Sequence, residues 1–166
     1  PCVEDFHKDF RYLDYTDDIY VGYRYFETIP GAKEMVRYPF GYGLSYTSFE
    51  TGKGKISRKS MKADGSVKVT VPVTNTGDRK GTETIQIYIK ALDYPEAPIK
   101  SLKGFRKLYL EAGETGKAEI VLDGEAFEYY DPSIDELSVR PGRYQILYGT
   151  SSSEEDLKAI DFVVKE

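Results

Sequence analysis

Apolar and polar residues alternate along several short stretches that follow about residue 53. In VKVTVPV, the alternation places Val67, Val69, Val71 and Val73 on one face of a predicted strand. Pro72 in the same run predicts either an edge strand or an exposed N–H position. The same alternation predicts strands in ETIQIYIK (83–90), GFRKLYL (104–110), GKAEIVL (116–122), RPGRYQILYG (140–149) and KAIDFVVK (158–165).

The segments between these runs are rich in turn-forming residues. TNTGDRKG predicts a hairpin that closes over residues 76–81, and two prolines predict a long loop over 92–103 that crosses between sheets. Residues 151–158 (SSSEEDLK) begin like a helix, but their place between two strands predicts a loop. About seven short strands at this spacing indicate a mainly β fold, an immunoglobulin-like or fibronectin type III-like β-sandwich.

The first third of the chain follows a different pattern. IYVGYRYF (19–26) shows little alternation and predicts a strand covered on both faces, and residues 32–37 predict one or two helical turns that end before Pro39. The first 50 residues hold eight Tyr and five Phe, more than half of the chain's 15 Tyr and 8 Phe. So short a segment rarely buries that load alone, and we expect it to pack against a body of protein that need not lie in this chain.

Composition excludes several classes of partner. A formal charge of −5 argues against binding nucleic acid or anionic membranes, both of which need a basic surface. No apolar run approaches the roughly 18 residues of a membrane span. Without Trp, and with a single Cys that cannot form an internal disulfide, the core is expected to consist of Val, Ile, Leu, Tyr and Phe, which disfavours an immunoglobulin domain proper.

The start of the chain leaves its cellular location open. Pro1 in place of Met, with no signal-peptide pattern, suggests a fragment or a processed chain, and either a cytoplasmic or a secreted location fits.

Few residues form a pattern with catalytic or metal-binding chemistry. Cys2 and His7 make a weak dyad because no third residue orients them, and one His with one Cys is a poor zinc site. Asp14, Asp17 and Asp18 lack the spacing of a calcium loop and predict a solvated loop. We therefore expect no metal, no cofactor and no catalytic residue in this chain.

Aromatic residues on a β-sandwich can instead stack on sugar rings. The candidates for such stacking are Tyr88, Tyr94, Tyr109, Tyr129 and Tyr130. Tyrosines in sandwich folds are more often half-buried core or corner residues, and no aromatic row on one strand face is evident, so sugar binding is the less favoured interpretation.

Specific motifs resemble a known family. IYVGYRYF followed by YPFGYGLSYTSF resembles the end of the α/β sandwich domain in glycoside hydrolase family 3. NTGDRKGTETIQIYI, SLKGFRKLYLEAGET and VRPGRYQILYGTSS resemble the fibronectin type III-like domain of that family. The resemblance covers nearly the whole chain, from about Asp18 to Val164, and PFGYGLSYT is its most specific motif.

The resemblance implies a division of the chain and a function for the whole protein. Residues 1–50 would be the terminal segment of the α/β sandwich domain with the inter-domain joint, and residues 51–166 the fibronectin type III-like domain. The family's enzymes are β-glucosidases, β-xylosidases and related exo-acting enzymes. The implied mechanism is retaining, with an Asp nucleophile on a barrel domain and, in the glucosidase branch, a Glu acid/base on the α/β sandwich, both outside this chain.

The partners implied are the remaining domains or chain of the same glycosidase and, for the whole enzyme, a β-linked glucoside or xyloside. A homo-oligomer is also compatible. We expect loops 92–103 and 129–138 to approach the active-site mouth or a second subunit; which residues contact substrate is unknown.

The stretch YPFGYGLSYTSFE is expected to be a fixed joint between domains. Gly41 and Gly43 allow a close-packed backbone, whereas a mobile tether would be rich in Gly and Ser or in Pro. The residues expected to fill the domain interface are Phe40, Tyr42, Tyr46 and Phe49. Two alternatives remain: a free-standing carbohydrate-binding or adhesion module without catalysis, and a purely structural spacer.

Overall fold

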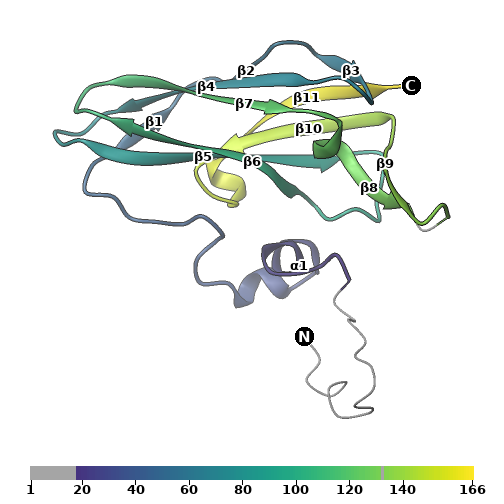
Figure 1. Cartoon of the computed structure of the whole chain (residues 1–166). Helices are drawn as coiled ribbons and strands as arrows, with labels where there is room; N and C mark the ends of the chain where they lie inside the picture. The colour runs from purple at the N-terminus through teal and green to yellow at the C-terminus, as the bar shows by residue number, and fades with distance from the viewer. Residues whose placement is uncertain (1–17, 132) are drawn as a thin grey trace, which may run out of the picture.

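The computed structural model describes residues 18–131 and 133–166, and two β-sheets packed face to face form its body (Figure 1). The first sheet contains β1 (Phe49–Thr51), β2 (Lys55–Ile56), β4 (Val67–Asn75) and β7 (Thr115–Leu122). The second sheet has the order β3 (Ser60–Lys62), β11 (Leu157–Lys165), β10 (Gly142–Gly149), β5 (Gly81–Ala91) and β6 (Ser101–Leu110). A separate hairpin pairs β8 (Glu128–Asp131) with β9 (Glu136–Val139). The prediction of a mainly β sandwich is confirmed.

Helical structure is limited to short pieces. They are α1 (Tyr23–Thr28) and the 3₁₀ helices η2 (Ala32–Met35), η3 (Gly124–Phe127) and η4 (Glu154–Asp156). Among the residues described, none of these is long and apolar enough to cross a bilayer. The helical turn predicted after residue 32 is present as η2, and the stretch 151–158 contains η4 within the connection from β10 to β11.

The core lies between the two sheets and follows the alternation in the sequence. The four valines of β4 are fully buried, as are Ile85 and Ile87 of β5. Of the other residues expected to point inward, Ile89, Ala118, Ile120, Leu122, Tyr144, Ile146, Tyr148, Phe162 and Val164 are buried and Ile160 is half-buried. Fully burying a Val, Ile, Leu or Phe side chain contributes roughly 1.5–3 kcal/mol, so this face is a major source of the fold's stability.

The hairpin predicted over residues 76–81 is wrong, because β4 and β5 belong to different sheets. The turn instead carries the chain from the first sheet to the second. Asn75, fully buried, anchors the turn: its Oδ1 accepts hydrogen bonds from Gly77 N (3.1 Å) and Thr47 Oγ1 (2.7 Å), and its Nδ2 donates to Arg79 O and Leu110 O. The crossing predicted for the 92–103 loop is also wrong, because that loop joins β5 to β6, which are neighbours in the second sheet.

Pro72 does not mark an edge strand, because β4 pairs with β7 on one side and with β1 and β2 on the other. Its carbonyl accepts a hydrogen bond from Gly52 N at 2.9 Å, between the end of β1 and the start of β2. Because the N and O of one strand residue point to the same side, the missing N–H faces this break in the pairing. The missing N–H therefore interrupts no strand pairing, and Pro72 itself is half-buried.

The strand predicted over IYVGYRYF is wrong, because its second half, residues 23–26, forms the start of the helix α1 and its first half lies in no strand. Tyr23, Phe26 and Glu27 stand at positions i, i+3 and i+4 and so share one helix face. Figure 1 shows α1 beneath the sandwich, on the side of the second sheet. A run of apolar residues without clear alternation fits either a short helix or a strand buried on both faces, so apolar content alone did not distinguish them.

Candidate interdomain interface

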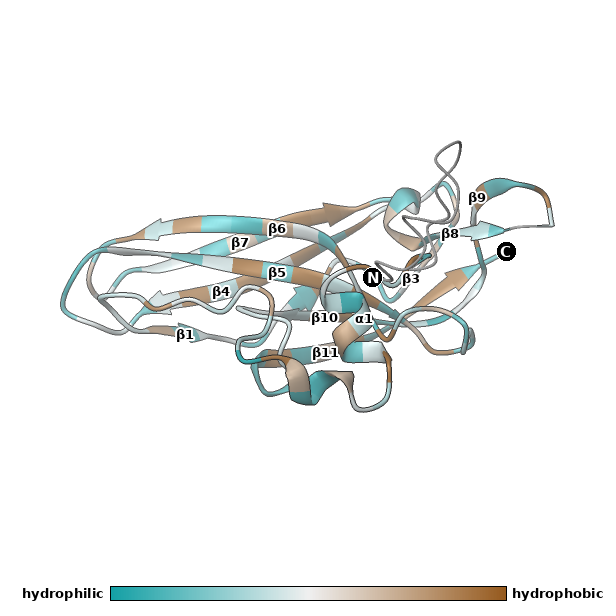
Figure 2. Cartoon of the chain, turned by 90° about the horizontal axis from the view of Figure 1, so that it is seen from below, coloured by the Kyte–Doolittle hydropathy of each residue, from teal (hydrophilic) through white to brown (hydrophobic). Residues whose placement is uncertain are grey.

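The segment that contains α1 covers the outer face of the second sheet, the face seen in Figure 2. Gln86 and Tyr88 point away from the core, since Ile85, Ile87 and Ile89 point into it. Yet Tyr88 is fully buried, and only 5% of Gln86 is exposed. The Tyr23 ring meets Tyr88 edge-on with centroids 5.9 Å apart, and burial raises the pKa of both tyrosines. The second sheet is therefore buried on both faces at its centre.

Polar contacts fix α1 to the loop between β5 and β6 and to the start of β6. Leu102 N donates to Tyr23 Oη at 2.7 Å, and Ile99 N donates to Thr28 Oγ1 at 3.1 Å. Lys100 forms an ion pair with Glu27, in which the two side chains are only 4% and 13% exposed. A buried pair of this kind holds one geometry because either charge alone would be costly in that place.

The chain after η2 is fixed to the same sheet. Ser152 N donates to Phe40 O at 2.8 Å, and the Phe40 ring lies 5.2 Å from the Tyr23 ring. Gly41 has a φ of +85°, and a Cβ there would lie 2.0 Å from Nε2 of Gln86, so no other residue fits without a shift. These contacts support a joint with a defined path.

The four residues predicted to fill a domain interface have different surroundings. Phe49 lies in β1 and packs against the core of the sandwich itself. Phe40 and Tyr42 are each about half exposed, at 48% and 51%, and Tyr42 stacks on Tyr38 with centroids 4.8 Å apart. Tyr46 is 95% exposed. Phe49 thus has a role inside the domain, and the other three keep ring surface free for a partner.

Neighbouring side chains extend this exposed apolar surface, which we call the joint surface. Its members are Met35, Tyr38, Phe40, Tyr42, Leu44 and Tyr46, each at least 48% exposed. Single exposed apolar side chains are ordinary in soluble proteins, but their concentration in residues 35–46 favours an interaction surface.

A groove of about 500 Å³, here called the α1 groove, lies beside the joint surface. Phe26 of α1, Met35 and Val36 at the end of η2, and Phe40 line it, and Ser152 approaches from the β10–β11 connection. Its lining is largely apolar, and the Lys100–Glu27 pair also contributes to it. Across it, Lys33 Nζ lies 3.9 Å from Glu154 Oε2.

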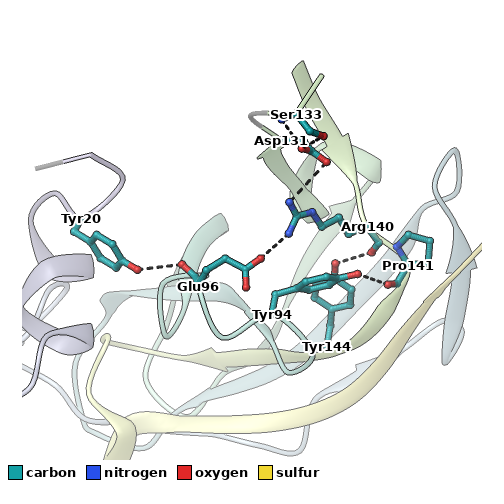
Figure 3. Close-up of polar contacts among 8 residues, drawn as sticks. All are labelled: Tyr20, Tyr94, Glu96, Asp131, Ser133, Arg140, Pro141 and Tyr144. Carbon is teal, nitrogen blue, oxygen red and sulfur yellow. Dashed lines mark hydrogen bonds and ion pairs between the residues drawn. The ribbon is translucent and has the colours of Figure 1, made fainter. Parts of the chain in front are cut away.

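A second cluster, centred on Arg140, connects three separate parts of the chain (Figure 3). Arg140 Nη1 donates to Glu96 Oε1 at 2.7 Å, and Nη2 lies 3.8 Å from Asp131 Oδ2. The guanidinium also lies over the rings of Tyr129 (4.1 Å) and Tyr94 (5.1 Å). The Arg140 cluster therefore ties the β5–β6 loop to the β8–β9 hairpin and to the start of β10.

Hydrogen bonds to backbone carbonyls complete the Arg140 cluster and connect it to Tyr20, which precedes α1. Tyr20 Oη donates to Glu96 O at 3.0 Å, and Tyr144 Oη donates to Arg140 O at 2.7 Å (Figure 3). Hydrogen bonds from Ser133 hold the pKa of Asp131 below its usual value, and burial raises the pKa of Tyr144 to about 12. Loops 92–103 and 129–138 thus meet each other, and their approach to an active site or a second subunit stays a prediction.

The five tyrosines considered for sugar stacking fall into two groups. Tyr88 is fully buried, and Tyr94 and Tyr129 are engaged with Arg140, so none of these three offers a free ring. Tyr109 and Tyr130 are 76% and 46% exposed. Sequence reasoning missed Phe105, which is 67% exposed and lies on the same face of β6 as Tyr109, four residues away. The alternation in GFRKLYL, which turns Leu108 and Leu110 inward, could have identified it.

Most of the weak catalytic and metal-binding candidates cannot be placed. Cys2, His7, Asp14 and Asp17 lie outside the described residues, and Asp18 is exposed. Within the described part of the chain, no three His, Cys, Asp or Glu side chains gather closely enough to hold a metal ion.

Comparisons with known proteins identify the class of protein to which this fold belongs. Residues 83–152 match the family model for a fibronectin type III-like domain. Over 159 residues the chain is 44% identical to a xylan 1,4-β-xylosidase from Xylanibacter ruminicola, covering 93% of this chain and 17% of that enzyme. It is 38% identical to β-glucosidase A from Butyrivibrio fibrisolvens, covering 98% of this chain and 21% of that enzyme.

Solved structures agree with these relatives. A family 3 β-glucosidase from Bifidobacterium adolescentis superposes with a TM-score of 0.85 at 34% identity, over 99% of this chain and 23% of that one. A β-glucosidase from Kluyveromyces marxianus superposes with a TM-score of 0.82 at 37% identity, over 98% and 19%. The chain therefore corresponds to the C-terminal part of glycoside hydrolase family 3 β-glucosidases and β-xylosidases, including their fibronectin type III-like domain. It spans about a fifth of the length of these relatives.

Proposed function

We propose that this chain is the C-terminal portion of a family 3 β-glycosidase, most consistent with an exo-acting β-glucosidase, and that it braces the catalytic domains. The observation that carries the proposal is the two-sided character of residues 19–46. One side of this segment is fixed to the sandwich by the Lys100–Glu27 pair and the Tyr23 contacts, and its other side presents the joint surface. A segment built in this way fits between two domains.

In the complete enzyme this chain would hold structure and leave the chemistry to other domains. Residues 1–50 would complete the α/β sandwich domain and form the joint, and residues 51–166 would be the fibronectin type III-like domain. Hydrolysis would be retaining, with an Asp nucleophile and a Glu acid/base supplied by the other domains. Phe40, Tyr42 and Tyr46 would contact those domains, and Phe49 would fix the start of the sandwich.

The test compares the 166-residue chain with the complete polypeptide that its gene encodes. We expect the complete polypeptide to release nitrophenol from nitrophenyl β-glucoside, with nitrophenyl β-xyloside as the competing substrate, and the chain alone to release none. Tyr42→Ala in the complete enzyme should lower the thermal midpoint while kcat/KM stays unchanged below that midpoint. Lost turnover in a Tyr42→Ala enzyme of unchanged thermal midpoint would contradict the bracing role.

One observation favours the alternative of a carbohydrate-binding module. Phe105 and Tyr109 project from the same face of β6, an edge strand, and both rings are largely exposed. If the chain alone is retained on a cellulose or xylan column, and the double variant Phe105→Ala/Tyr109→Ala is not, the binding module is supported and the bracing function is not needed. We expect both proteins to pass through unretained.

A further inference from the structure

The α1 groove is an apolar surface whose own charges are already paired. Lys100 is bound to Glu27 in the groove lining, and Lys33 lies beside Glu154. No unpaired charge among these four remains to attract an ionic ligand. The chemistry that fits the rest of the surface is therefore an apolar partner.

Several large apolar side chains around the groove are largely exposed to solvent. Met35 is 77% exposed and Tyr38 60% exposed, and both line the groove together with the half-exposed Phe40. In addition, the hydroxyl oxygen of Ser152, itself buried, has no hydrogen-bond partner among the described residues. An unsatisfied buried hydroxyl costs about 1–3 kcal/mol, which favours an occupant that also supplies a polar group nearby.

The groove is continuous with a contact that the chain already makes. Tyr23 and Phe40, which line it, are the same residues that cover the outer face of the second sheet. The relatives that this chain matches are about five times longer, so a large body of polypeptide is available as the occupant.

We propose that the α1 groove receives an apolar segment from the remainder of the glycosidase, which packs a large apolar side chain on Met35, Tyr38 and Phe40 and brings a hydrogen-bonding group to Ser152. This inference rests on the proposed function and adds to it the place and the chemistry of the contact. Binding there would extend the layer that α1 forms on the sandwich.

Oxidation of methionine by hydrogen peroxide tests the contact, because the sulfur reacts only where solvent reaches it. The chain has two methionines, Met35 (77% exposed) and Met61 (4% exposed), so Met61 is an internal buried control. Val121→Met supplies an exposed control, since Val121 is 64% exposed on β7 of the opposite sheet. Peptide mass spectrometry then reports sulfoxide formation at each position.

We expect Met35 and Val121→Met to oxidise at similar rates in the 166-residue chain and Met61 far more slowly. In the complete polypeptide Met35 should oxidise at least about tenfold more slowly, while the rate at Val121→Met is unchanged. Equal Met35 rates in the chain and in a complete enzyme that hydrolyses β-glucosides would overturn the groove assignment and leave the proposed function intact. A complete polypeptide without hydrolase activity would instead overturn the proposed function, whatever the Met35 rate.

Two further arms identify other occupants. Protection of Met35 in the chain alone that disappears on dilution would assign the groove to a second copy of the chain. Protection of the chain alone by cellobiose or xylobiose would assign it to a carbohydrate. Either result would refute the proposal that the groove receives another part of the enzyme.

Discussion

Replacing Lys100 by Met should release α1 from the sandwich without unfolding the sandwich. Met keeps a long apolar side chain in the site but removes the cation that faces Glu27, in a contact where the two side chains are 4% and 13% exposed. Removing one partner of a buried ion pair costs about 3–5 kcal/mol, because the other charge stays buried without compensation.

The cost should fall on docking, because neither Lys100 nor Glu27 belongs to the apolar core between the sheets. At about 1.4 kcal/mol per power of ten, 3–5 kcal/mol raises the undocked population by roughly two to three and a half powers of ten. The thermal midpoint of the sandwich should change little, since the buried strands of both sheets keep their contacts.

Limited trypsin digestion measures the undocked population, because cleavage at Arg24, Lys33 and Arg37 requires local opening of residues 19–46. The double variant Lys100→Met/Glu27→Met should recover most of the protection, since apolar residues of similar size often replace a buried pair without loss. Glu154→Gln is the surface control, because its pair with Lys33 is about two-thirds exposed and should contribute little. Two results would refute the reasoning: a Lys100→Met chain as resistant as the parent, or a double variant as susceptible as the single one.

Three other substitutions test separate contacts. Arg140→Met should speed amide hydrogen exchange in the β8–β9 hairpin. Arg140→Lys should have an intermediate effect, because an ammonium cannot reproduce the planar contacts of a guanidinium. Unchanged exchange in both variants would contradict this. Burial raises the pKa of Glu83, so the stability of the fold falls as pH rises through that pKa. Glu83→Gln should therefore raise the free energy of unfolding at pH 7, but not at a pH below about 4.3, the pKa of an exposed Glu. Urea titration at these two pH values measures the difference, and an equal gain at both would contradict it. Gly41→Ala should displace the joint, because its Cβ would meet Gln86. Trypsin should therefore cleave at Arg37 faster in this variant than in a Gly43→Ala control, where a Cβ meets nothing within 4 Å.

The strands of the sandwich could be predicted because one physical fact determines them. A strand with one buried face must alternate, and the burial of β4 does so without exception. In β5 the isoleucines keep the same spacing of two, although its outer face is covered as well. The pairing of those strands could not be predicted in the same way. A turn rich in Asn, Gly and Asp looks alike whether it joins neighbours in one sheet or crosses to the other. The crossing here depends on Asn75, whose contacts reach Leu110 far along the chain.

The candidate interface was predictable in part. The concentration of aromatic residues before residue 50 indicated that this segment needs cover from other protein, which stays a prediction for partners outside the chain; within the chain, Tyr23 and Phe40 already pack together and Tyr23 meets Tyr88 of the sandwich. The sequence did not reveal that Phe49 belongs to the sandwich or that Tyr88 faces outward and is buried. Both facts depend on which part of the fold covers a residue, and the local pattern of apolar residues does not contain that information. Arg140 was missed for the same reason, since its partners lie in the β5–β6 loop, in β8 and in β10.

The burial of β5 explains why the domain needs α1. Residues 85–89 are buried in succession, which a two-layer sandwich with one solvent-facing side would not produce. A third layer must therefore cover the outer face, and α1 with the following residues provides it. That layer in turn exposes Met35, Tyr38 and Phe40 on its far side, so it has the same need for cover that the sheet had. The layering continues outward from the sandwich and leaves an apolar surface on its far side, which is the surface that the proposed bracing function needs.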